Sequence, residues 1–241
     1  MKIRLDNLLI NKGLVETVTK GQALIMAGEI YVDGKIVDKP GTLVFDKSEL
    51  YLKPPSLYVS RGALKIEKAY QEFSLDFKDK IFCDIGSSTG GFTDFSLQHG
   101  ARLVFAIDVG HGQLDQKLRI DSRVIVMERT DFRHVEKLPE KIDYFLCDVS
   151  FLSLTKILPY INKLSDYSTY VIALIKPQFE ASDKEVSRGK GVIRSVETRQ
   201  EITDKMKRFA AEIGFEVLGL LESPIKGAKG NVEYLIYLFK P

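Results

Sequence analysis

Apolar positions near the N-terminus repeat with the spacing of short helices and then alternate. Apolar residues between positions 3 and 9 fall on one helical face, and this helix is expected to end at Gly13. A second helix is predicted from near Thr17 to Gly28. Residues 30–37 (Ile-Tyr-Val-Asp-Gly-Lys-Ile-Val) predict a β-hairpin, because Asp-Gly accommodates the positive φ angles of a tight turn. These elements predict a small α+β unit.

Two adjacent prolines, Pro54 and Pro55, interrupt this pattern. Tandem prolines end regular structure, because each fixes φ and lacks a backbone N–H donor. We therefore expect a first domain at 1–52, a linker at 53–59 and a second domain at 60–241.

After the linker, apolar runs typical of strands alternate with helical patterns. Strands are predicted at 81–85, 102–108, 124–127, 142–149 and 170–176, and helices at 90–98, 153–164 and 195–213. Thr198 and Glu201 are expected to form a capping box in the last helix. The alternation favours a mostly parallel sheet with right-handed crossovers. Two closing runs, 215–221 and 232–239, predict a hairpin that adds an antiparallel strand, so the fold class is α/β.

Composition excludes several classes of protein. The 241 residues include 35 Lys plus Arg and 33 Asp plus Glu, and the net charge of +2 does not indicate nucleic-acid binding through bulk charge. Uncharged stretches are far shorter than the roughly 20 residues of a membrane span, and the N-terminus does not resemble a signal peptide. Cys83 and Cys147 lie in strand-like runs and are too few for a disulfide scaffold. We expect a reduced, soluble, cytoplasmic protein.

The segment 83–92 (Cys-Asp-Ile-Gly-Ser-Ser-Thr-Gly-Gly-Phe) ends a predicted strand and opens a helix. Gly86, Gly90 and Gly91 would let the backbone approach a ligand closely, although a tight turn without a ligand explains them as well. The segment matches neither a P-loop nor G-x-G-x-x-G, so it does not indicate a phosphate site. Asp84 instead favours a cationic or amine-bearing ligand, and S-adenosylmethionine fits because it carries a sulfonium, an amino group and no phosphate.

Two further acids follow the next strands. Asp108 ends the second strand, where a carboxylate can bind both hydroxyls of a ribose. Asp131 follows the third strand and could accept a hydrogen bond from an adenine amino group. Three acids after three successive strands indicate an adenosyl ligand without phosphates.

Eight segments distributed over essentially the whole chain carry a family resemblance. They are Arg4–Asp6, Gln22–Gly28, Val59–Lys65, Asp84–Asp94, Asp108–Leu114, Cys147–Phe151, Ile175–Glu180 and Gly230–Glu233. With these segments the chain resembles the TlyA (hemolysin A-like) family of ribosomal RNA ribose 2′-O-methyltransferases. The resemblance implies an S4 RNA-binding domain followed by an FtsJ-type methyltransferase domain with a Rossmann-like sheet. It also implies S-adenosylmethionine as cofactor and ribosomal RNA in ribosomal subunits as substrate.

The same resemblance implies a catalytic tetrad formed by Lys65, Asp148, Lys176 and Glu233. Cofactor contacts are expected from Asp84, Gly86, Ser88, Thr89, Gly90, Gly91, Phe92, Asp108, Asp131 and Asp148. Lys176 is the proposed base, which requires a neutral amine; Lys65 favours that form, whereas the two carboxylates favour the ammonium. As an alternative, Lys176 stabilises a developing alkoxide while water takes the proton. On spacing alone, Lys65 belongs to a solvated basic helix face.

Charge within residues 1–60 is nearly balanced, with eight Lys or Arg against seven Asp or Glu, so RNA binding by this part rests on the S4 resemblance. That resemblance implies that the two short helices bind structured RNA, although Val18 stands where the S4 pattern usually has an arginine. The expected RNA contacts are Arg4 and Lys20, Arg61 and Lys68 on one helix with Lys65, and Arg188 and Lys190 in a glycine-containing loop. A solvated loop explains the last two equally well.

Other chemistries fit less well. Amino-group methylation of bases usually requires Asn/Asp-Pro-Pro-Tyr where this chain has Asp-Val-Ser-Phe at 148–151, and strand alternation directs Cys147 away from the site. Tyr144, Phe145 and Phe151 are expected in the core, although Phe151 could lie beside the ligand. The three histidines lack metal-ligand spacing, so no metal is predicted. A non-catalytic RNA-binding assembly protein is the main alternative, a membrane-lytic protein is a weaker one, and a monomer is expected.

Overall fold

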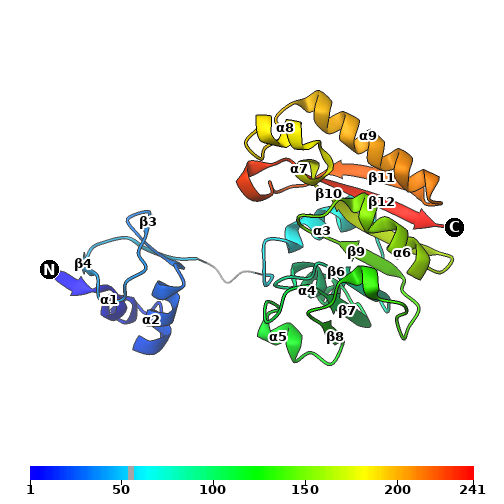
Figure 1. Cartoon of the computed structure of the whole chain (residues 1–241). Coiled ribbons are helices and arrows are strands. Elements are labelled where there is room, and N and C mark those ends of the chain that lie inside the picture. Colours follow the sequence, from blue (N-terminus) through cyan, green and yellow to red (C-terminus); the bar gives the residue numbers. More distant parts are fainter. Residues whose placement is uncertain (54–56) are drawn as a thin grey trace. The chain divides into compact units, whose positions relative to one another are not determined.

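The chain consists of two compact units, Met1–Leu57 and Tyr58–Pro241 (Figure 1). The structure, a computed structural model, describes residues 1–53 and 57–241. Pro54, Pro55 and Ser56 of the expected linker therefore lie outside the described residues. Within the described part of the chain, no helix has the length and apolar character needed to cross a membrane.

The first unit combines two helices with two small sheets. The helices are α1 (Leu5–Asn11) and α2 (Val18–Met26), one sheet pairs β1 (Lys2–Arg4) with β4 (Leu43–Phe45), and the other orders β3 (Lys35–Ile36), β2 (Ile30–Val32) and β5 (Leu50–Leu52). Thr17 caps α2, and Asp33 and Gly34 take the positive φ angles predicted for the hairpin turn. Ile3 lies in β1, so its expected place in the first helix is wrong. Strands as short as β1, β4 and β5 carry too little alternation to be predicted.

The second unit contains a seven-stranded sheet in the order β11-β12-β10-β9-β6-β7-β8. The strands are β6 (Ile81–Ile85), β7 (Leu103–Ile107), β8 (Val124–Met127), β9 (Tyr144–Cys147), β10 (Thr169–Ile175), β11 (Glu216–Glu222) and β12 (Tyr234–Lys240). Strands β8, β7, β6, β9 and β10 pair in parallel, whereas β12 is antiparallel to both β10 and β11. The predicted α/β sheet with an antiparallel terminal hairpin is confirmed.

Helices cover both faces of this sheet. Apolar side chains of α3 (Ala63–Glu72), α4 (Gly91–Gln98) and α5 (Gln116–Arg119) pack in the core on one face. Those of the 3-10 helix η2 (Leu154–Lys156), α6 (Leu158–Leu164) and α9 (Val196–Glu212) pack on the other. Shorter elements are η1 (Phe132–His134), α7 (Pro177–Glu180), α8 (Asp183–Arg188) and η3 (Ala228–Gly230). Figure 1 shows α9 lying along β11.

Three details differ from the sequence prediction. The helix predicted at 153–164 is divided between η2 and α6. The expected capping box of Thr198 and Glu201 is wrong, because α9 begins earlier and Ser195 accepts the hydrogen bond from the Thr198 N–H. The predicted glycine-containing loop of Arg188 and Lys190 is preceded by α8, which includes Arg188 and begins with a capping box formed by Ser182 and Glu185.

The strand order reverses between β6 and β9, because β7 lies on one side of β6 and β9 on the other. In open α/β sheets, ligands bind at the carboxyl ends of the strands next to such a reversal. Here Gly86 follows β6 and Asp148 follows β9, and a Cβ atom on Gly86 would lie 2.9 Å from the Asp148 carbonyl oxygen. A side chain at position 86 would collide with the loop after β9, so only glycine allows the two loops to lie this close together.

Candidate active site

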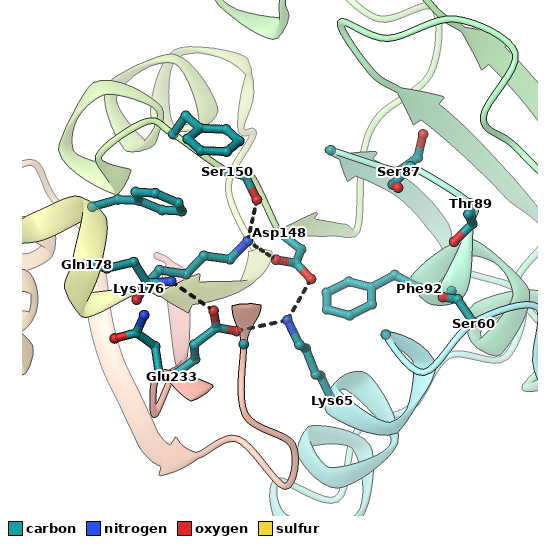
Figure 2. A pocket seen from close by; sticks show the side chains of 18 of the residues that line it. Ser60, Lys65, Ser87, Thr89, Phe92, Asp148, Ser150, Lys176, Gln178 and Glu233 are labelled. Carbon is teal, nitrogen blue, oxygen red and sulfur yellow. Dashed lines mark hydrogen bonds and ion pairs between the residues drawn. The ribbon is translucent and has the colours of Figure 1, made fainter. Parts of the chain in front are cut away.

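Four charged side chains from separate elements, three of them buried and Asp148 partly buried, meet at this edge of the sheet (Figure 2). Lys65 lies on α3, Asp148 and Lys176 directly follow β9 and β10, and Glu233 directly precedes β12. Because β12 is antiparallel to β10, with Tyr234 opposite Ile175, the start of β12 lies beside the end of β10. The structure therefore brings together the four residues that the sequence analysis assigned to the tetrad.

Two lysines and two carboxylates bind one another within this cluster. Lys65 Nζ lies 3.0 Å from Asp148 Oδ2 and 3.0 Å from Glu233 Oε2. Lys176 Nζ lies 2.6 Å from Asp148 Oδ1 and donates to the Ser150 hydroxyl over 3.0 Å. The formal charges of two cations and two anions cancel, as a buried site requires. Lys65 thus has two anionic partners, whereas Lys176 has one anionic and one neutral partner.

Electrostatics within the cluster favours the charged forms of Lys65 and Asp148. Burial works against the Lys65 ammonium, but attraction to Asp148 and Glu233 is stronger, and the pKa of Lys65 is raised. Burial likewise works against the Asp148 carboxylate, but Lys176 and Lys65 outweigh it and lower the pKa of Asp148. The two groups therefore form a stable ion pair near neutral pH.

Two residues that the sequence analysis did not identify hold Glu233 in place. Gln178 Nε2 donates to Glu233 Oε1 over 3.2 Å (Figure 2). On the other side, a Cβ atom at Gly227 would lie only 1.9 Å from Glu233 Oε1, so the carboxylate occupies the space that a side chain would need. Gln178 lies within a segment that carried the family resemblance, but nothing in the sequence around Gly227 indicated this close contact.

Asn231 connects the segment after α8 to the loop that carries Glu233. Its buried side chain donates from Nδ2 to the Gly191 carbonyl over 2.8 Å, and its Oδ1 accepts from the Ile193 N–H over 3.0 Å. This role of Asn231 was not predicted, although Asn231 directly follows Gly230 in a family segment.

The tetrad and the β6 loop line one cavity of about 470 Å³. This volume is within the range of small-molecule sites. Of the expected cofactor residues, Asp84, Gly86, Ser88, Thr89, Gly91, Phe92 and Asp148 line it. A second cavity of about 360 Å³ shares Gly86, Ser88 and Asp148 with the first, and Asp108 and Asp131 line it. The two cavities therefore adjoin at the reversal of strand order.

Asp84 presents a carboxylate oxygen that lacks a partner. Its Oδ2 accepts hydrogen bonds from the Thr93 N–H and hydroxyl, but its buried Oδ1 has no hydrogen-bond partner among the described residues. Burial, opposed by the bonds from Thr93 and assisted by the charge of Asp148, raises the pKa of Asp84 to about 7. A buried, unsatisfied carboxylate oxygen is suited to a ligand that donates hydrogen bonds and carries positive charge.

The other two acids are already engaged by the protein. Asp108 accepts from the Ser88 N–H over 2.8 Å and from the Gly110 N–H over 2.7 Å, and so ties the β6 and β7 loops together. Asp131 forms an ion pair of 2.6 Å with Arg133, which lowers the pKa of Asp131 to about 2. An adenine amino group would therefore share Asp131 with Arg133.

Gly90 lines neither cavity. Its φ is +95°, and a Cβ atom there would lie 2.2 Å from Leu118 Cδ1. Gly91 does line the larger cavity, but its Cβ would also lie 2.4 Å from Ser60 Oγ. Both glycines thus allow the start of α4 to pack against other parts of the protein, which the sequence analysis had not considered.

Phe151 is not a core residue, and this part of the prediction is wrong. Its side chain is 90% exposed, lines both cavities and lies 5.2 Å from the Phe179 ring between centroids. Tyr144 and Phe145, within β9, are buried as predicted, and so are both cysteines. Phe151 lies beyond the end of β9, where strand alternation no longer decides which residues are buried.

The residues expected to bind RNA are distributed over both units. Lys20 is exposed on α2, and Arg4 is half exposed while donating to Asp6 from Nε and Nη2. Arg61 precedes α3, so the prediction that it lies on one helix with Lys68 is wrong. Lys68 pairs with Glu72 on α3, and Arg188 and Lys190 are exposed at the end of α8 and just after it. No group of His, Cys, Asp and Glu side chains among the described residues is arranged to hold a metal ion.

Comparison with known proteins identifies both parts of the chain. Residues 58–240 match the FtsJ-like methyltransferase family, and residues 3–45 match the S4 domain. YqxC of Bacillus subtilis, described provisionally as an rRNA methyltransferase, is 46% identical over all of this chain and 86% of its own length. The 16S/23S rRNA (cytidine-2′-O)-methyltransferase TlyA of Mycobacterium tuberculosis is 37% identical over 98% of this chain and 90% of its own.

A solved structure from Streptococcus thermophilus, described provisionally as a hemolysin, covers 99% of this chain and 88% of that one, with a TM-score of 0.76 and 44% identity. The fold, the four-residue cluster and these full-length similarities agree. This chain belongs to the TlyA family, whose members join an S4 domain to an FtsJ-like methyltransferase domain.

Proposed function

We propose that this protein transfers a methyl group from S-adenosylmethionine to ribose 2′-hydroxyls of ribosomal RNA in ribosomal subunits. The observation that carries the proposal is the meeting of Lys65, Asp148, Lys176 and Glu233 in a cavity that also contains the unsatisfied oxygen of Asp84. The relatives named as rRNA methyltransferases support the substrate class. We further propose that the protein acts as a monomer in the cytoplasm.

The residues of the two cavities fit S-adenosylmethionine. The free carboxylate oxygen of Asp84 can accept a hydrogen bond from an amino group. The loops approach closely at Gly86, which lines both cavities, so one extended ligand can occupy the two. Asp108 and Asp131 line the second cavity, where they can accept from ribose and adenine. When bound, the cofactor supplies a methyl group that its sulfonium has already activated, so the protein has to position the hydroxyl and remove its proton.

We assign proton removal to Lys176. Lys65 is held by two carboxylates, whereas among the acids that the structure describes Lys176 pairs with Asp148 alone, and it donates a hydrogen bond to Ser150. Deprotonation of Lys176 therefore breaks one ion pair, whereas deprotonation of Lys65 would break two. In this scheme Lys65 stays charged and orients both carboxylates. If Lys176 instead stabilises an alkoxide as an ammonium, water takes the proton of the hydroxyl and Lys176 keeps its own.

RNA binding is assigned to both parts of the chain. We propose that residues 1–52 act as the S4 RNA-binding domain and residues 60–241 as the catalytic domain. Exposed cations on each part, Arg4 and Lys20 on the first and Arg61, Lys68, Arg188 and Lys190 on the second, are proposed to contact RNA phosphates. Because only a few cations are placed this way, the near-neutral net charge of the chain is compatible with an RNA substrate.

The proposal is tested by incubating the full-length protein with unmodified ribosomal subunits and labelled S-adenosylmethionine. Wild type should incorporate label into 2′-O-methyl ribose, and Lys176→Ala should lose this activity while keeping its affinity for the cofactor. Lys163→Ala is the matched control, because Lys163 is an exposed lysine on α6, outside both cavities. Equal incorporation of label by wild type and Lys176→Ala would contradict the role assigned to the tetrad in the reaction. Tight binding of subunits without methyl transfer by wild type would favour a non-catalytic assembly protein.

A further inference from the structure

Among the described residues of the first unit, the sheet of β1 and β4 has one face whose side chains are exposed. Along these strands Ile3 and Val44 turn toward the core, whereas Lys2, Leu43 and Phe45 are exposed and Arg4 is half exposed. Register places Lys2 opposite Phe45 and Arg4 opposite Leu43. Since directly opposed residues share a face of an antiparallel pair, these four side chains form one surface, called here the β1–β4 face.

The β1–β4 face combines an aromatic ring with cations. Phe45 is 59% exposed, and the Lys2 ammonium lies over its ring at 5.5 Å from the centroid. Leu43 is also 59% exposed beside Arg4, whose guanidinium remains accessible although it donates to Asp6. Proteins that bind single-stranded nucleic acid stack bases on exposed aromatic rings and hold phosphates with neighbouring cations.

A protein partner is less well matched to this surface. The second sheet of the same unit provides a contrast, because its exposed Tyr51 and Ile36 flank Tyr31 across the strands and carry no cation opposite them. An apolar surface of that kind is typical of a protein contact. On the β1–β4 face, by contrast, each apolar side chain stands opposite a Lys or Arg, which matches a ligand that is both aromatic and anionic.

We propose that the β1–β4 face binds an unpaired segment of the substrate RNA, with a base stacked on Phe45 and adjacent phosphates held by Lys2 and Arg4. The inference rests on the proposed function, because it takes RNA as the substrate, and it adds a surface beyond the two helices through which an S4 domain is expected to bind. Phe45 then favours single-stranded over double-stranded RNA, since a paired base cannot offer its face to the ring.

The absence of tryptophan from the chain permits a direct test. Phe45→Trp introduces one reporter whose fluorescence a stacked base quenches, and Tyr51→Trp is the matched control on the second sheet, where the native side chain is 55% exposed. Both full-length variants are titrated with a mixed-sequence single-stranded oligoribonucleotide, with an RNA duplex of equal length and with inorganic polyphosphate. We expect saturable quenching of the Phe45→Trp protein by the single strand alone, and none of the Tyr51→Trp protein.

Phe45→Ala should weaken binding of the same single strand by roughly five-fold or more, the lower end of measured base-stacking contributions. Quenching by polyphosphate, equal quenching in the Tyr51→Trp control, or unchanged affinity of Phe45→Ala would overturn the inference. Methyl transfer by wild type is measured separately on ribosomal subunits. Transfer without quenching rejects the β1–β4 face alone, whereas quenching without transfer to any subunit rejects the proposed function and leaves the RNA surface in place.

Discussion

Gly227→Ala provides a sharp test of the site geometry, because it perturbs Glu233 without altering any charged group. The added Cβ atom would lie 1.9 Å from Glu233 Oε1, whereas an ordinary contact begins at 3.4 Å, so one partner must retreat by about 1.5 Å. Glu233 is the end of a flexible side chain, and it can move more readily than the backbone around Gly227, whose N–H donates to the Asn231 carbonyl. The carboxylate is therefore expected to swing out of its present position.

The consequence follows from the distances around that carboxylate. Its bonds of 3.0 Å to Lys65 and 3.2 Å to Gln178 cannot both survive a displacement of that size. Displacing a group in a catalytic constellation by about 1 Å can cost about 100-fold in rate, which corresponds to about 2.7 kcal/mol of transition-state stabilisation. We expect Gly227→Ala to lower kcat for methyl transfer by about that factor while the affinity for S-adenosylmethionine changes little, because Glu233 does not line the second cavity.

The assay is a two-by-two comparison of labelled-methyl transfer to ribosomal subunits. Wild type, Gly227→Ala, Glu233→Ala and the double variant are measured, and calorimetry gives the cofactor affinity of each. Because Glu233→Ala removes the atoms that the new methyl group would meet, Gly227→Ala should have no further effect in that background. Gly214→Ala serves as a stability control: Gly214 has a φ of +94° and no neighbour near its Cβ, so this substitution strains the backbone after α9 without touching the site.

Methyl transfer by Gly227→Ala at the wild-type rate would contradict the predicted displacement of Glu233. Effects of Gly227→Ala and Glu233→Ala that multiply would contradict it too, because the loss would then arise from the backbone of the loop and not from the displaced carboxylate. Loss of activity in Gly214→Ala in proportion to its lower thermal stability would show that the assay reports folding.

Four further outcomes are expected. Because the pKa of Asp84 is raised to about 7, affinity for the cofactor should rise as the pH increases through 7, and calorimetry on Asp84→Asn should show no such rise. For the free protein the same shift makes the folded state hold a proton that the unfolded chain releases near pH 4, so stability to urea should fall between about pH 4 and 7 in wild type and less in Asp84→Asn. Lys65→Ala leaves two buried carboxylates without their shared cation and should cost about 3 to 5 kcal/mol in urea unfolding, against about 0.5 kcal/mol for the exposed Lys68→Ala. Asn231→Ala removes two buried hydrogen bonds and should cost about 2 kcal/mol, seen as a fall in Tm of about 4 to 8 °C.

The sheet and its connections could be predicted from the sequence because its strands are almost wholly buried. All five residues of β6 and all four of β9 are buried, and such strands appear as continuous apolar runs between turn residues. Strands β1, β4 and β5 of the first unit were missed for the opposite reason. In β4 only Val44 faces the core, and a single buried residue in a three-residue strand is too little to reveal an alternating pattern of apolar and polar positions.

The tetrad could be placed at one edge of the sheet because strand ends are fixed by topology. Asp148 and Lys176 follow adjacent parallel strands, which brings them together whatever the details of packing. Glu233 is different, because its position depends on β12 lying beside β10, and the sequence pattern predicts an antiparallel hairpin strand but not which strand it pairs with. The family resemblance assigned Glu233 to the tetrad, and the pairing of β12 with β10 explains how it reaches the other three residues.

The glycines of the site show why the remaining details could not be predicted. A sequence reveals where a Cβ atom is missing, but not which atom occupies the vacated space. At Gly86 that atom belongs to the backbone of the neighbouring loop, at Gly90 to Leu118, and at Gly227 to the carboxylate of Glu233. Only the last of these bears directly on the chemistry, yet it was the glycine that local pattern did not single out. The atom that occupies the space beside each glycine therefore decides which glycines are catalytically important, and substitution at Gly227 tests that directly.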